Sequence, residues 1–183
     1  NMATLFVDKI DPQSGTSLTI GSSGDTVALT SGVVQSNLNY PAFLVHKTGN
    51  QDISEATDTK VTWDSESIDT DSAFASDKFT VPSGKAGKYM LNGSIQTSAV
   101  GQDEYQYGFC KIYKNGSGII QQMFDCRNNN LRQIPIVFNF LIDLAVSDYI
   151  EIYINLGTSG SNQRIAGDSS YIATWFSGYR IGT

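Results

Sequence analysis

The sequence predicts an all-β protein, a sandwich or a jelly roll, and three observations support this prediction. Charged residues make up 16% of the chain, below the usual quarter, and small polar residues and 17 Gly take their place. Apolar residues alternate with polar ones over much of the chain, and we find no segment with a helical period. Turn-forming residues recur between the alternating segments, which is typical of antiparallel sandwiches.

From Pro41 onward, the alternation defines a series of strands with no helix between them. The predicted strands cover residues 42–48, 59–68, 77–82, 87–98, 105–114, 118–126, 133–144, 148–157 and 170–181. Turn signals rich in Gly, Asn and Ser separate them, at 48–50, 83–85, 115–116, 128–130 and 157–160.

The strand at 133–144 is unusual because both of its faces contain apolar residues. One face is continuous, and it comprises Ile134, Ile136, Phe138, Phe140, Ile142 and Leu144. The other face adds Val137 and Leu141. In 87–98, by contrast, Tyr89, Leu91 and Ile95 alternate with mainly polar residues, as in a strand that has one wet face.

Tyrosines extend this pattern to two more strands. In 148–157, Tyr149 and Tyr153 lie on the face opposite to a row of isoleucines, and in 105–114, Tyr107 and Tyr113 share one face. A sandwich hides one face of each strand, so a second apolar or tyrosine-rich face predicts self-association. We therefore expect a subunit interface formed by Val137, Leu141, Tyr149, Tyr153, Tyr107 and Tyr113.

The first 40 residues have a different composition. Residues 11–39 are mainly small and polar, and their apolar residues include two alternating pairs, Leu18 with Ile20 and Val27 with Leu29. The pairs predict two very short strands, which cannot build a core alone. The segment is either disordered or shares a core with identical copies, and we favour three copies that place these four side chains around a common axis. Residues 1–40 are thus predicted to form a short β shaft or docking segment, and residues 41–183 a head.

Composition also excludes several classes of partner. The net charge of −6 disfavours nucleic acid, because phosphate binding needs clustered cations. No apolar run approaches the length of a membrane helix, so we expect no membrane insertion. The first residues lack a basic region followed by an apolar stretch, and we expect no signal peptide there.

Residues able to perform catalysis are few, and we expect no enzyme and no cofactor. His46 is the single histidine, which excludes sites that need two imidazoles. Carboxylate pairs such as Asp64 with Glu66 lie in polar stretches, where they usually provide solubility; a carbohydrate-cleaving protein is the catalytic alternative. Cys110 and Cys126 flank a predicted hairpin turn and could form a cross-strand disulfide, but two small buried thiols are favoured.

Several short motifs in residues 41–183 occur in an order that resembles the globular heads of the complement C1q family, which belong with the tumour-necrosis-factor-like jelly rolls. The motifs are Phe79-Thr80-Val81-Pro82, Gly87-Lys88-Tyr89, Lys114-Asn115-Gly116, Ser147-Asp148-Tyr149 and Phe176-Ser177-Gly178-Tyr179. The resemblance implies a ten-stranded jelly roll that packs as a homotrimer. Ser147 replaces a usual glycine and residues 83–86 form a longer link, so no receptor or ligand residue is carried over.

Residues 2–32 are similar to the leader and shaft segments of tail-fibre and head-fibre proteins of marine bacteriophages. Together, the two resemblances imply a non-enzymatic viral structural protein, a trimeric tail fibre or capsid decoration on the virion. Its N-terminal segment would contact other virion proteins, and its head would attach to a host-surface glycan or outer-membrane component. The alternative is a secreted complement-like adhesion or signalling module. Some relatives of the head bind calcium, for which Asp69, Asp71 and Asp77 are the candidate ligands here.

Overall fold

A computed structural model describes residues 10–15, 18–28, 31, 40–101, 104–127, 131–160 and 162–182. The chain divides into two compact units, Asn1–Ser36 and Asn37–Thr183, and each is described by itself. The described residues of the second unit form strands and no helix, which confirms the all-β prediction. No helix among the described residues is long and apolar enough to cross a membrane.

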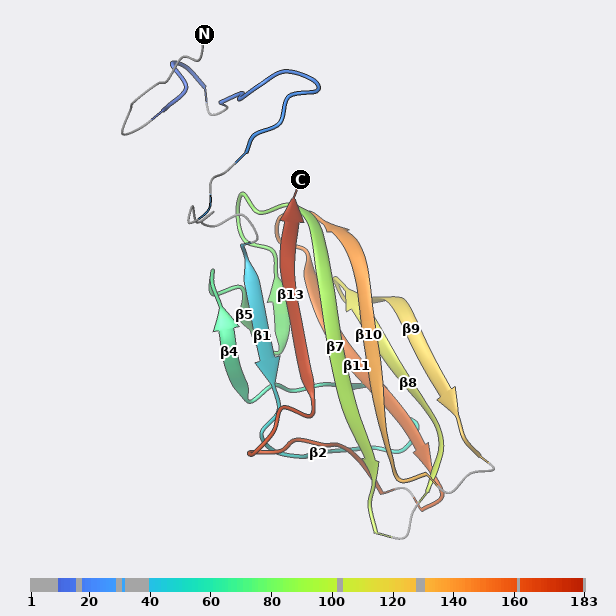
Figure 1. Ribbon diagram of the computed structural model, residues 1–183. Helices are drawn as coiled ribbons and strands as arrows, with labels where there is room; N and C mark the ends of the chain where they lie inside the picture. The colour runs from blue at the N-terminus through green and yellow to red at the C-terminus, as the bar shows by residue number, and fades with distance from the viewer. Residues whose placement is uncertain are drawn as a thin grey trace. The chain divides into compact units, whose positions relative to one another are not determined.

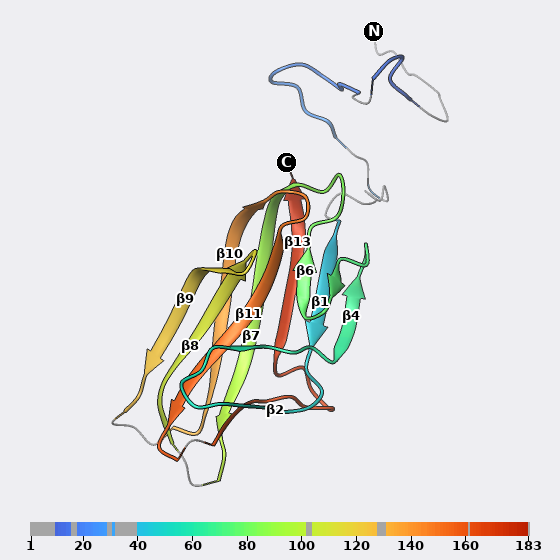
Figure 2. The same cartoon turned by 180° about the vertical axis from the view of Figure 1, so that it is seen from behind.

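Two antiparallel sheets form the second unit (Figures 1 and 2). The seven-stranded sheet contains β1 (Ala42–His46), β2 (Gln51–Ile53), β4 (Ser65–Asp69), β7 (Gly87–Ala99), β10 (Gln133–Leu144), β12 (Gln163–Ile165) and β13 (Trp175–Gly182). The six-stranded sheet contains β3 (Thr59–Lys60), β5 (Phe74–Ala75), β6 (Lys78–Thr80), β8 (Tyr105–Lys114), β9 (Ser117–Asp125) and β11 (Tyr149–Thr158). Chain neighbours often lie in different sheets, as in a jelly roll.

The order of strands in the seven-stranded sheet is β2-β12-β7-β13-β1-β4, and β10 also pairs with β7. The first strand of the head therefore lies beside the last, with Ala42 opposite Tyr179. The chain enters the head and leaves it at the same end of the sheet. We call the opposite end, where β2 and β12 lie, the distal end (Figure 1).

The core fills the space between the two sheets. The alternation in the sequence predicted the inward faces of β7 and β11 correctly. Tyr89, Leu91 and Ile95 of β7 are buried, and so are all four aliphatic residues of β11. An aromatic cluster joins the sheets, in which the ring of Phe43 stacks on Phe79 at 4.6 Å and meets the edge of Phe176 at 4.9 Å. Such pairs add to the stabilisation that burial provides.

The structure has thirteen strand segments among its described residues, where the resemblance implied ten. The predicted strand 59–68 is two strands, because the chain passes from one sheet to the other near Val61 and Trp63. The predicted strand 170–181 begins only at Trp175. Three short strands, β2, β5 and β12, were missed because two or three residues are too few to show alternation.

The described part of the N-terminal unit contains no strand. The two short strands were predicted there with a core shared among identical copies, because the segment has too few large side chains to build a core alone. Leu18, Ile20 and Val27 are 45%, 65% and 60% exposed, and Leu29 lies outside the described residues. A core that these residues share among three copies stays a prediction.

Replacement of Gly93 by alanine should destabilise the head by about 1–3 kcal/mol, the usual cost of overpacking. A Cβ at Gly93 would overlap the ring of Phe138, which lies opposite it in β10. Urea denaturation followed by tryptophan fluorescence measures the loss. Gly118→Ala is the matched control, because a Cβ there would lie at an ordinary 3.6 Å from Tyr113. Equal stability of Gly93→Ala and the wild-type chain would contradict the packing described here.

Candidate functional site

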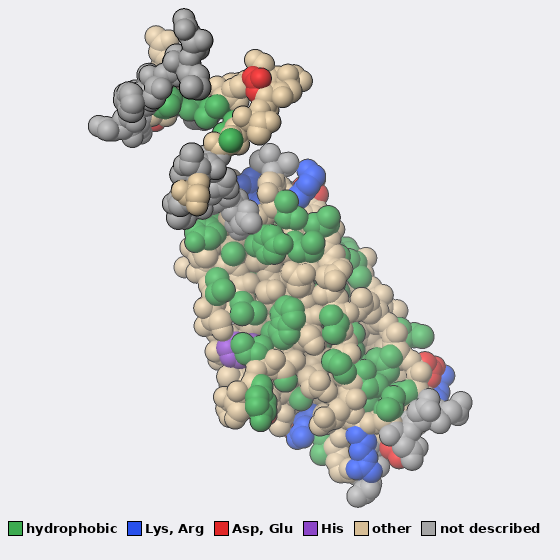
Figure 3. Space-filling view, viewed as in Figure 1, with side chains coloured by type: hydrophobic (Ala, Val, Ile, Leu, Met, Phe, Trp, Pro, Cys, Tyr) green, Lys and Arg blue, Asp and Glu red, His purple; other side chains and the backbone are tan. Residues whose placement is uncertain are grey.

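The outer side of the seven-stranded sheet is rich in hydrophobic side chains (Figure 3). Val137 and Leu141 of β10 are 58% and 64% exposed, and they alternate with the buried Ile136 and Phe138. Further residues of the same side come from β1, β4, β7, β13 and the segment before β13. We call this surface the apolar face, and it comprises Leu44, Ile68, Met90, Val137, Leu141, Ile172, Trp175 and Tyr179.

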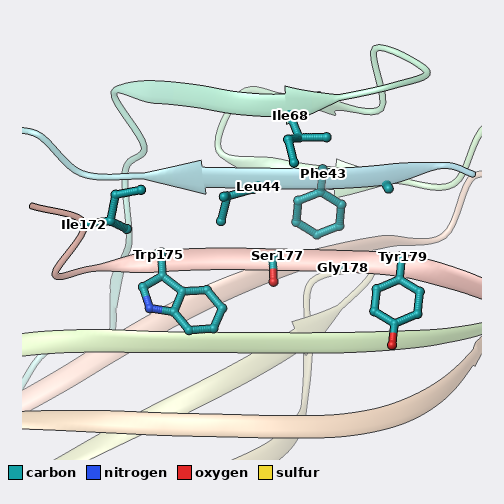
Figure 4. Close-up of a pocket in the computed structure, with 9 residues that line it drawn as sticks. Phe43, Leu44, Ile68, Ile172, Trp175, Ser177, Gly178 and Tyr179 are labelled. Carbon is teal, nitrogen blue, oxygen red and sulfur yellow. The ribbon is translucent and has the colours of Figure 1, made fainter.

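A groove of about 550 Å³ hollows one part of the apolar face (Figure 4). Leu44 of β1 and Trp175 and Tyr179 of β13 line it, together with Ile68 and Ile172. Phe43 and Gly178, which lie opposite each other in β1 and β13, complete the lining. These residues were not predicted from the sequence, although Leu44 lies between two apolar neighbours in β1, which is the same signal that identified Val137.

The predicted tyrosines lie on the other side of the sandwich. Tyr107 and Tyr113 of β8, and Tyr149 and Tyr153 of β11, are half-buried on the outer side of the six-stranded sheet. The predicted interface residues therefore divide between two opposite surfaces. The structure does not bring Val137 and Leu141 together with the four tyrosines, and one flat contact cannot cover both sets.

Contacts within the chain already engage these tyrosines. The rings of Tyr113 and Tyr153 lie 4.3 Å apart, and the Lys78 ammonium lies 4.3 Å from the centre of the Tyr149 ring. The guanidinium of Arg127 lies over Tyr107 at 5.3 Å. This surface is consequently a mixed aromatic and charged one, whereas the apolar face includes uncharged polar residues, Asn92, Ser94, Asn139 and Ser177, between its hydrophobic side chains.

Asp58 lies at the centre of a hydrogen-bonded cluster on the tyrosine-bearing surface. Lys111 Nζ donates to both carboxylate oxygens at 2.7 Å, and Asn155 Nδ2 donates to Oδ1 at the same distance. The Tyr113 hydroxyl donates to Oδ2 at 3.2 Å. The hydrogen bond from Lys111 is the largest cause that holds the pKa of Asp58 below its usual range.

The three candidate calcium ligands have separate structural roles. Asp69 accepts hydrogen bonds from the backbone N–H groups of Ala73 and Phe74, at 2.9 and 3.0 Å. Asp77 accepts one from the Trp63 N–H at 2.8 Å. The Asp71 carboxylate accepts from Thr70 and lies 3.8 Å from Lys85. Within the described ranges, no group of three His, Cys, Asp or Glu side chains is arranged to hold a metal ion.

In the predicted carboxylate pair of Asp64 and Glu66, the surroundings of Asp64 favour its ionised form. Burial opposes ionisation of Asp64, but hydrogen bonds from Thr48 and the charge of Lys47 outweigh it, so the pKa of Asp64 is lowered. A general acid needs a raised pKa. Glu66 is exposed on β4, and His46 makes a 3.3 Å contact with Ser67.

Both cysteines are free and buried, which confirms the prediction of small buried thiols. Cys110 lies opposite Gln122 in the hairpin of β8 and β9, whereas Cys126 follows the end of β9. Burial raises the pKa of the Cys110 thiol to about 12, so it is unreactive at neutral pH.

Asp58→Asn should reduce the stability of the head at neutral pH, and the difference from the wild-type chain should shrink as the pH falls towards 3. The lowered pKa of Asp58 means that its ionised form stabilises the folded state above the unfolded pKa of about 3.9. That contribution is lost as the pH falls through the folded pKa. Urea denaturation at several pH values tests this, with Glu66→Gln as the exposed control. A difference that did not change with pH would contradict the role of Lys111.

Comparison with known proteins identifies the fold. No family model matches the sequence, and no curated protein does. The globular domain of zebrafish complement 1qA is similar in structure, with a TM-score of 0.50 and 14% identity over 77% of this chain and 97% of that one. The Eiger tumour necrosis factor of S. frugiperda has a TM-score of 0.56 and 10% identity, over 76% of this chain and 90% of that one. The head therefore has the jelly-roll fold of complement C1q and tumour-necrosis-factor domains. Neither structure supports the resemblance of residues 2–32 to bacteriophage fibres.

Proposed function

We propose that the chain is a non-enzymatic homotrimeric module whose heads associate through the apolar face. The observation that supports this most is the exposure of Val137 and Leu141 beside a groove lined by Trp175 and Tyr179. Large exposed apolar patches on soluble domains mark interaction sites. The number three rests on the fold, because the C1q-type resemblance implies a trimer.

The shape of the apolar face suits a ring of copies. Leu141 and Val137 project from β10, whereas the groove lies across β7 from them, between β4, β1 and β13. One part of the face thus has two exposed aliphatic side chains, and the other part is a hollow. In a head-to-tail contact, these side chains of one copy enter the hollow of the next, and such contacts close into rings when the rotation permits.

The module would present three identical distal ends to a target surface. Three weak sites on one rigid assembly bind more tightly than one site without any new contact. The first candidate, which the N-terminal sequence favours, is a virion appendage that attaches to a host glycan or outer-membrane component. A secreted complement-like module is the second candidate, and the likeness of the head to complement 1qA favours it.

Leu141→Glu should convert the trimer to a monomer, because a carboxylate cannot enter an apolar contact without a large desolvation cost. Light scattering after gel filtration should give about 60 kDa for the wild-type chain, three times the 19.9 kDa subunit, and the subunit mass for the variant. Met123→Glu is the matched control, because Met123 is 62% exposed but lies on β9 in the other sheet. A monomeric wild-type chain would refute the trimer. A monomeric Met123→Glu variant together with a trimeric Leu141→Glu variant would refute the assignment of this face.

Antibody raised against the head should label purified virions at one fixed structural position, seen by negative-stain electron microscopy. The N-terminal segment would hold the protein there, so removal of residues 1–40 should abolish labelling and leave the head folded. The unlabelled chain, added in excess, serves as the competition control. Unlabelled virions together with the trimer in the culture medium would reject the virion form and favour the secreted module.

A further inference from the structure

A polar cleft of about 410 Å³ lies at the distal end of the seven-stranded sheet. Its volume is within the range of small-ligand sites. The lining comes from five separate parts of the chain and consists of Asn50, Gln96, Gln133, Arg164, Ala166, Gly167, Asp168 and Ala173. The cleft is thus rich in amide groups and contains one guanidinium and one carboxylate.

Arg164 is the feature of the cleft that points to a ligand. It lies in β12, opposite Ser98 of β7, and its Nε is buried without a hydrogen-bond partner. Asp52 lies opposite it in β2, yet no ion pair involving Arg164 occurs within the part of the chain that the structure describes. A buried N–H of a charged group is costly to leave unpaired. An anionic group bound in the cleft would remove this cost.

The amide groups around Arg164 suit a ligand that has several hydroxyl groups. Gln96, Gln133 and Asn50 have amide side chains, and the Gln96 Nε2 already donates one hydrogen bond to the Thr97 carbonyl oxygen at 3.4 Å. The Asn50 Oδ1 accepts from the Gly167 N–H at 3.2 Å, which fixes the amide so that its NH₂ group is the free end. Asp168 is likewise held, because its Oδ1 accepts from the N–H groups of Ser170 and Tyr171 at 2.7 and 3.2 Å.

We propose that the cleft binds a carboxylate-bearing sugar unit, such as a hexuronic acid residue of a surface polysaccharide. The fork of the Arg164 guanidinium matches the planar carboxylate, and the amides match the ring hydroxyls. The carboxylate of Asp168 would accept from a hydroxyl, and it repels a dianion such as a phosphate monoester more strongly than it repels a monoanionic carboxylate. Ala166 and Ala173 leave room for the ring of the sugar.

The cleft stays accessible in the proposed trimer. This inference rests on the proposed function only in that the trimer would present three copies of the cleft. Along β7, the apolar face covers the residues from Met90 to Ser94. Met90 lies opposite Leu141 of β10, and Ser94 lies opposite Val137. The cleft begins beyond this level, at Gln96, and continues to Arg164. An assembly that covers the apolar face leaves the distal end open.

Binding of methyl β-glucuronide to the full-length wild-type chain tests the ligand class. Saturation-transfer NMR titrations should show that it binds at least about tenfold more tightly than methyl β-glucoside, which has a hydroxymethyl group in place of the carboxylate. It should also bind at least about tenfold more tightly than glucose 6-phosphate. No binding of the glucuronide at millimolar concentration would overturn the proposal. Equal binding of the glucoside would remove the role of the guanidinium, and equal binding of the phosphate would refute the choice of a carboxylate.

Arg164→Gln should weaken the glucuronide at least about tenfold and leave the weak binding of the glucoside unchanged. Arg164→Lys keeps the charge but loses the fork, so it should restore part of the affinity. Asp52→Asn is the matched control, because it removes a charge opposite Arg164 and should leave binding intact or stronger. Gln133→Ala is a second test in case Arg164 variants unfold, and it should weaken both sugars.

Light scattering on the same samples separates this inference from the proposed function. A trimer that binds no glucuronide would reject the cleft and retain the module. A monomer whose binding of glucuronide depends on Arg164 would retain the cleft and reject the trimer. Wild-type affinity in the Arg164→Gln variant would reject the cleft whatever the mass of the protein.

Discussion

The seven-stranded sheet has apolar residues on both of its sides, and a sandwich can bury only one of them. Its inner side packs on the six-stranded sheet through Phe43, Phe138 and Phe176. Its outer side then exposes Val137, Leu141 and the groove beside Trp175. Because the inner packing fixes the direction of every side chain in these strands, the exposed face cannot be turned inward without a one-residue slip of the whole strand. The fold and the association that we propose thus depend on the same alternation.

The two outer surfaces of the sandwich differ in how far the chain satisfies its own groups. On the six-stranded sheet, Tyr113, Lys111 and Asn155 all bind Asp58, and Tyr153 lies against Tyr113. The carboxylate of Asp58 has its hydrogen bonds within the chain, and of the groups around it the Asn155 Oδ1 is buried without a hydrogen-bond partner. The apolar face has no comparable network over Leu44, Val137 and Leu141. This difference favours the apolar face as the contact between copies.

The sequence was sufficient to predict the long strands and their inward faces, because β7, β10 and β11 each contain enough alternating residues to show their period. It could not show that Val137 and Tyr149 lie on opposite surfaces, because alternation gives the side of each strand but not the sheet to which the strand belongs. The distal cleft was also hidden from the sequence. Asn50, Gln133 and Arg164 are far apart in the chain, and the pairings of β10 and β12 with β7 and of β2 with β12 bring them to one place.

The start of β1 and the end of β13 lie at the same end of the head, which has a mechanical consequence. A target held at the distal end and an anchor reached through Ala42 would pull along the axis of β1, which pairs with β13 on one side and β4 on the other. The interstrand hydrogen bonds run across the strands. Tension of this kind loads them in shear, all together, instead of opening them one after another as in a zipper. The head is thereby built to hold under traction from either end.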